Sequence, residues 1–159
     1  MPNRHDIHVL NDLIAATLDS AERLEQIAGD SESSGHGALF NGLAEERRDM
    51  AGVMAATVTA LGGHPDTSGS IFAKAQRAVM DVSHALMRDE AGLVNAADRG
   101  EAALDKRFHA AVADEKLSAT TRETIRRAHA AIHRETTEVH SLRRSVDGQK
   151  DASNNLFPQ

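Results

Sequence analysis

The sequence contains no cysteine, tryptophan or tyrosine, and only 3 of its 159 residues are proline. Without cysteine the chain cannot form a disulfide, a thiol nucleophile, a zinc finger or a cysteine-ligated iron–sulfur cluster. The scarcity of aromatic residues and proline disfavours β-sandwiches and barrels, which need aromatic and β-branched strands and frequent turns. No apolar run approaches the roughly 18 residues of a membrane span, and the first ten residues lack the apolar core of a signal peptide. We therefore expect a cytoplasmic protein with no membrane partner.

The chain is acidic, with a formal net charge of −6 and a pI of about 5.8. Acidic proteins bind polyanions poorly, so we expect no nucleic acid partner.

Helix-forming residues dominate the composition, since 27 residues are alanine and Leu, Glu and Arg are also common. Apolar residues recur at spacings of three and four, which predicts helices over residues 4–28, 38–61, 70–87, 89–115 and 118–146. The periodicity is lost over residues 147–159, where we expect a flexible C-terminal tail. Residues 1–146 are thus predicted to form one all-α domain.

The spacing of these helices predicts a four-helix bundle. The shorter helix, 70–87, lies in a connection of about 25 residues, long enough at 1.5 Å per helical residue to run the length of a bundle. Short loops join the long helices on either side of it into two antiparallel pairs. Two such pairs joined by one long crossover form a ferritin-like bundle.

Three segments resemble a known family: LNDLIAATLDS (10–20), LGGHPDTSGS (61–70) and RGEAAL (99–104). In this order and spacing, over about residues 8–145, they resemble a bacterial family of ferritin-like four-helix-bundle proteins classed as a domain of unknown function. The resemblance implies the fold and a bacterial, stress-related setting, and it implies no activity.

Each long helix carries one carboxylate on or beside its apolar stripe: Glu25, Glu46, Glu101 and Glu135. In the ferritin-like topology the last three lie within about 2 Å of one height, with Glu25 one or two turns nearer the end. Four converging carboxylates can provide ligands for a di-iron or di-manganese centre. However, the Glu-x-x-His pattern of such centres is missing, because the corresponding tetrapeptides are ERRD (46–49) and ETTE (135–138).

Arg47 offers a second interpretation of the same carboxylates. Its guanidinium can neutralise a buried carboxylate without a metal, and a buried charge must be either paired or coordinated. We favour this Arg–Glu network over the metal centre because the ligand set fits poorly.

Three of the nine histidines, His129, His133 and His140, lie on one strip of the last predicted helix. A pair at i and i+4 can bind Zn²⁺ or Cu²⁺, but half-buried histidines that cover a helix interface are the more common case. His109 has no evident partner in the sequence.

The sequence shows no nucleophile elbow, phosphate-binding loop or dinucleotide fingerprint. Our first hypothesis is therefore a protein that is not an enzyme, needs no cofactor, and acts by association with a second copy in a homodimer or with an unidentified protein. The alternative is a carboxylate-bridged di-metal oxidase or metal-handling protein, with iron or manganese held by the four glutamates.

Overall fold

The computed structural model describes residues 3–31, 35–67 and 89–156, which contain four helices and no strand. They are α1 (Arg4–Asp30), α2 (Gly37–Ala60), α4 (Glu90–Val112) and α5 (Ala119–Leu156). The predicted all-α class is confirmed. Four of the predicted helices appear within a few residues of their expected bounds, apart from the end of the last one. The predicted helix over 70–87 lies outside the described residues.

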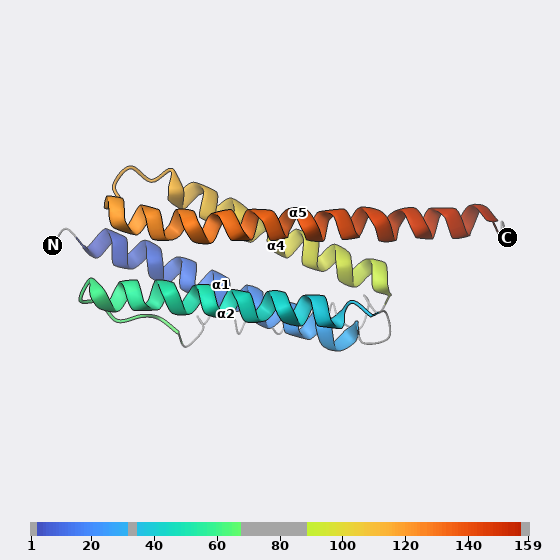
Figure 1. The fold of residues 1–159 in the computed structure, drawn as a ribbon, viewed down its shortest axis with the longest axis horizontal. Coiled ribbons are helices and arrows are strands. Elements are labelled where there is room, and N and C mark those ends of the chain that lie inside the picture. Colours follow the sequence, from blue (N-terminus) through green and yellow to red (C-terminus); the bar gives the residue numbers. More distant parts are fainter. Residues whose placement is uncertain (1–2, 32–34, 68–88, 157–159) are drawn as a thin grey trace.

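The helices form an elongated bundle in which neighbours run antiparallel (Figure 1). α1 packs against α2, and α4 packs against α5, along most of their lengths, whereas α2 and α5 meet at fewer points. The end of α2 and the start of α4 lie at opposite ends of the bundle. The connection between the two helical pairs must therefore span its length.

The helix ends follow the expected signals. Gly62, with φ +83°, ends the turn after α2 in the left-handed region that favours glycine. The carboxylate of Asp89 accepts a hydrogen bond from Gly92 N at 2.9 Å and caps α4. Ser118 Oγ accepts one from Thr121 N at 3.3 Å at the start of α5. The end of α5 was predicted wrongly, since the helix continues ten residues past Val146 to Leu156 with its last turns exposed. Flexibility of residues 147–159 stays a prediction.

The apolar core consists of two clusters stacked along the bundle axis. One contains Leu10, Ile14, Met54, Phe108, Ile125 and Ile132. The other contains Leu24, Phe40, Leu93, Val94 and Val139. On every helix a buried polar residue stands between the positions of the two clusters: Ser20, Arg47, Glu101 and Glu135. A polar layer therefore divides the core.

The structure corrects the predicted phase of α2. Leu39 was predicted to face the core, but it is 40% exposed, and the neighbouring Phe40 is fully buried instead. The buried stripe continues through Ala44, Arg47 and Ala51. This rotation by one residue places Arg47, rather than Glu46, in the core.

Within the described ranges, no helix combines the length and the apolarity that crossing a membrane requires.

Candidate functional site

The centre of the bundle holds an ion-pair network contributed by all four helices. Arg47 on α2 donates hydrogen bonds to Glu101 on α4 and to Glu135 on α5. Ser20 Oγ on α1 donates to the second carboxylate oxygen of Glu101 at 2.8 Å. All four residues are buried. The Arg–Glu network expected from the sequence is therefore present.

The network has one cation for two carboxylates, and this imbalance shows in the protonation of Glu135. Burial raises the pKa of Glu135 to about 7, the neighbouring Glu46 carboxyl raises it as well, and Arg47 opposes both. For Arg47, burial alone would lower the pKa, but Glu101 and Glu135 overcome this and raise it. Arg47 thus stays charged, and Glu135 is partly protonated near pH 7.

The structure brings only part of the predicted carboxylate set together. Glu101 and Glu135 meet at Arg47. Glu46 is exposed, and its carboxyl interacts with the layer through Glu135. Glu25 lies elsewhere, in a half-exposed ion pair with Arg48.

These residues do not fit a dinuclear metal centre. Two divalent cations between Glu101 and Glu135 would have to displace the guanidinium of Arg47, which already bridges the two carboxylates. No histidine belongs to the layer, and Glu25 points away to Arg48.

Residues of the first segment singled out in the sequence, LNDLIAATLDS, hold the fold together. The side chain of Asn11 donates to His64 O at 3.1 Å and accepts from Asp66 N at 2.9 Å, so it ties α1 to the loop after α2. Ser20, in the same segment, anchors Glu101. These two polar residues have contacts that stabilise the bundle.

Glycines of the other two segments provide space. A Cβ on Gly63 would lie 2.9 Å from the side chain of Ile7, and a Cβ on Gly100 would collide with the guanidinium of Arg23. Both glycines therefore permit close approach of α1 to a neighbouring segment.

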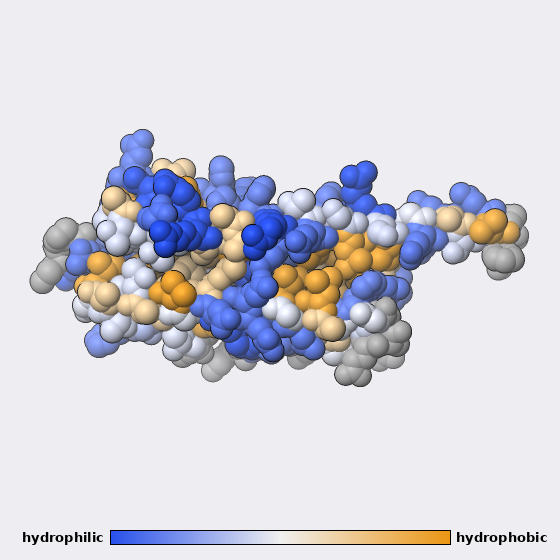
Figure 2. Space-filling model, viewed as in Figure 1, coloured by the Kyte–Doolittle hydropathy of each residue, from blue (hydrophilic) through white to orange (hydrophobic). Residues whose placement is uncertain are grey.

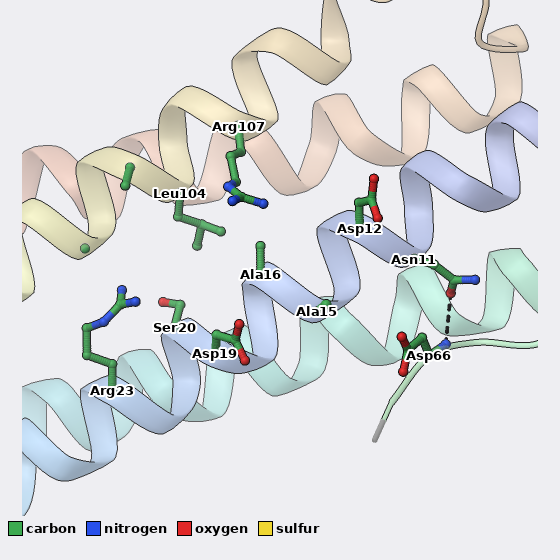
Figure 3. A pocket seen from close by; sticks show the side chains of 12 residues that line it. Asn11, Asp12, Ala15, Ala16, Asp19, Ser20, Arg23, Asp66, Leu104 and Arg107 are labelled. Atoms are coloured by element: carbon green, nitrogen blue, oxygen red, sulfur yellow. Dashed lines mark hydrogen bonds between the residues drawn. The ribbon is translucent and has the colours of Figure 1, made fainter. Parts of the chain in front are cut away.

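A pocket of about 340 Å³ lies beside this contact, between α1 and α4 (Figure 3). Arg23 and Arg107 face it together with Asp12 and Asp19, and small residues such as Ala16 form its floor. Because both signs of charge line the pocket, it shows no preference for an anionic or a cationic ligand.

A second hollow, of about 350 Å³, lies between α2 and α5, which pack less closely than α1 with α2 or α4 with α5. It is lined by Ala38, Leu39, Gly42, Leu43, Glu46, Arg134, Glu135 and Glu138. We call it the α2–α5 groove. Figure 2 shows hydrophobic surface between these two helices, flanked by hydrophilic side chains.

The histidines of α5 face carboxylates of α4. His129 Nε2 lies 3.0 Å from Asp105 Oδ1, and His133 Nδ1 lies 3.1 Å from Asp105 Oδ2. His140 Nδ1 lies 3.3 Å from Asp98, which also accepts a hydrogen bond from Arg143. All three therefore lie beside α4, but only His129 is half-buried as predicted, since His133 and His140 are exposed.

Sequence reasoning missed Ser20, Asp98, Asp105 and His109. The ring centroids of His109 and His129 are 5.8 Å apart. Nothing in the sequence pattern predicted this contact between the two helices. Only the spacing of Asp105 and His109, four residues apart on one helix face, was available as a signal.

A family model matches residues 5–114 of the chain, and its description is "Domain of unknown function (DUF2383)". The chain belongs to this family. The match agrees with the unknown-function part of the resemblance seen in the sequence. Among curated proteins, none matches the chain.

The DUF2383 match covers α1, α2 and α4 and ends just before α5. It therefore contains Ser20, Arg47 and Glu101, which form three of the four parts of the polar layer. Glu135 and the histidines of α5 lie beyond it.

Proposed function

We propose that this DUF2383 protein is a non-catalytic, ferritin-like four-helix bundle that binds a cationic, amphipathic segment of a partner protein in the α2–α5 groove. The ferritin-like assignment is supported by two antiparallel helical pairs in which the end of α2 and the start of α4 lie at opposite ends of the bundle. A non-catalytic role is supported by Arg47, which fills the position where metal ions would lie in a carboxylate-bridged enzyme.

The observation that carries the binding proposal is a buried acceptor at the groove. The side chain of Glu135 is only 4% exposed, it lines the groove, and its Oε1 atom accepts no hydrogen bond from a donor group of the described residues. The neighbouring carboxyl of Glu46 can pair with it only when one of the two carboxyls is protonated. A buried acceptor left unpaired costs about 1–3 kcal/mol. A lysine or arginine side chain that enters the groove would satisfy it.

The remaining lining favours the same kind of occupant. Glu46 and Glu138 add two carboxylates, against the single cation Arg134, so the groove is acidic. Leu39, 40% exposed, and Leu43 provide apolar surface beside these charges. Apolar and acidic surface in one groove between helices suits an amphipathic helix with a basic side.

Binding is tested with a synthetic amphipathic helical peptide. One face of the peptide carries leucines, the opposite face carries lysines, and a single tryptophan is included. Because the protein has no tryptophan or tyrosine, the fluorescence of the peptide reports binding directly. We expect saturable one-to-one binding that weakens at least about tenfold when Leu39→Asp disturbs the groove. Binding should also tighten from pH 6 to pH 8, because a cation favours the ionised form of Glu135.

The matched control is Val53→Asp on the same helix, since Val53 is 60% exposed and does not line the groove. Equal effects of Leu39→Asp and Val53→Asp, or no saturable binding, would contradict the proposal. Sedimentation of the protein alone decides the homodimer. A stable dimer that Leu39→Asp dissociates would show that a second copy, rather than a cationic partner, covers the groove.

A further inference from the structure

The strongest group of metal-ligating atoms in the described residues lies outside the central layer, on the surface of the α4–α5 pair. Asp105, His129 and His133 each offer one ligand atom, and these atoms lie within 4.8 Å of one another. Two helices contribute to the group. His129 and His133 are four residues apart on α5, so both rings project from the same face of that helix.

The spacing of these atoms is close to that around a tetrahedral ion. Zinc–nitrogen and zinc–oxygen bonds of about 2.0–2.1 Å place neighbouring tetrahedral ligands about 3.3–3.4 Å apart. The carboxylate of Asp105 lies 3.0 Å from His129 Nε2 and 3.1 Å from His133 Nδ1. These two contacts use different oxygens of Asp105, and the ligand atoms lie within 4.8 Å of one another, so the two rings must draw closer together around an ion.

We propose that Asp105, His129 and His133 form a binding site for one divalent transition-metal ion, with Zn²⁺ the best match. Imidazole nitrogen and carboxylate oxygen are donors that Zn²⁺ accepts, and three protein ligands leave a fourth position for water. The site is reachable from solvent because His133 is 66% exposed, whereas Asp105 and His129 are largely covered.

The ion would link α4 to α5, because Asp105 lies on α4 and both histidines lie on α5. Asp105 already bridges the two histidines of α5, so an ion replaces weak contacts by coordination bonds. The proposal is independent of the α2–α5 groove, since no residue of the site lines it.

The test is a competition titration of metal-free protein with Zn²⁺ against a chromophoric zinc indicator. We expect one Zn²⁺ per chain. Removing even a supporting group commonly weakens a metal site 10–100-fold, so we expect His133→Ala to weaken binding at least about tenfold. Zn²⁺ should raise the melting temperature of the wild-type protein and not that of His133→Ala.

Two other histidine–carboxylate pairs supply the controls. His8 lies 3.3 Å from Asp12 on the surface of α1, and His140 lies 3.3 Å from Asp98 on the same α4–α5 pair. His8→Ala and His140→Ala should bind Zn²⁺ like the wild type. Unchanged affinity in His133→Ala, or an equal loss in either control, would overturn the site and indicate binding spread over surface histidines. The exposure of His133 makes its replacement compatible with folding.

Discussion

At the scale of single residues, Arg47 supplies the positive charge of the polar layer. It is a fully buried cation on α2 that bridges Glu101 and Glu135. Burying an ion is costly, and the cost is offset only while its partners are present. The neighbouring Arg48 has the same chemistry in a different setting, because its pair with Glu25 is half exposed.

Replacing Arg47 by methionine should destabilise the protein by about 3–5 kcal/mol, since two buried carboxylates lose their counter-ion. Arg48→Met should cost no more than about 1 kcal/mol, because exposed ion pairs contribute little. Urea unfolding of the two variants side by side measures this difference. Similar losses for both variants would show that the network contributes no more than a surface pair.

Glu135 gives the network a dependence on pH. The unfolded chain ionises this carboxyl near its ordinary pKa of 4.5, whereas burial holds the pKa in the folded protein at about 7. Between these values the folded state binds more protons, so this group makes folding more favourable as the pH falls from about 7 to about 4.5.

Glu135→Gln should remove this contribution, because the amide resembles the protonated carboxyl. The free energy of unfolding, measured from pH 5 to pH 8, should then fall less steeply with rising pH than in the wild type. The wild-type curve includes the histidines as well, so only the difference between the two curves reports Glu135. Parallel curves would mean that Glu135 titrates as an ordinary carboxyl.

Among the elements, α5 is the longest helix and extends beyond the other three (Figure 1). Its start is fixed by Asp6 on α1, which accepts a hydrogen bond from Ser118 N at 3.2 Å. Burial would raise the pKa of Asp6, but hydrogen bonds from Ser118 hold it below its ordinary value. The far end of the helix is fully exposed over residues 148–156.

A chain ending at Gly148 should unfold with a free energy within about 0.5 kcal/mol of the full chain, because the removed turns bury nothing. Among the contacts of the described residues, it loses the exposed contact of Lys150 with Asp89, at 3.6 Å. Circular dichroism should report less helix, while the urea midpoint stays the same. A loss above about 2 kcal/mol would reveal that these turns pack against something, and would favour self-association.

α2 shows where a sequence pattern misleads. Leu39, Leu43 and Met54 suggested one stripe, whereas the buried stripe runs through Phe40, Arg47 and Met54. The two stripes share members and differ by one residue because Ala44, Ala51 and a buried arginine are weak hydrophobic signals. Helix positions and caps were predictable, since glycine, proline and capping residues act locally.

The site was predictable only in part, for a similar reason. Glu101 and Glu135 interrupt strong apolar stripes, so their burial followed from periodicity on one helix. Pairings between helices depend on rotation and register, which periodicity fixes only to about a turn. Hence Glu25 was predicted to converge with the other carboxylates, whereas it pairs with Arg48. The contacts of Asp105 and His109 with the histidines of α5 were not predicted.

At the scale of the whole molecule, the polar layer joins four helices at one height between two apolar clusters. Apolar side chains tolerate many offsets between helices, whereas a buried cation with two specific acceptors tolerates few. Buried polar groups fix register in some helical assemblies, and this arrangement suits the same role. The central claim is that Arg47, and not a metal ion, neutralises the carboxylates of this layer.

Metal content tests this claim most directly. The protein, with His129 and His133 replaced by alanine to remove the surface site, is incubated anaerobically with Fe²⁺ and Mn²⁺ and thoroughly desalted. Mass spectrometry then counts the ions per chain in a sample shown to be helical. Our account predicts no retained ion, with Glu101→Gln indistinguishable from its parent. One or two ions per chain that disappear in Glu101→Gln would contradict it and establish a carboxylate metal centre.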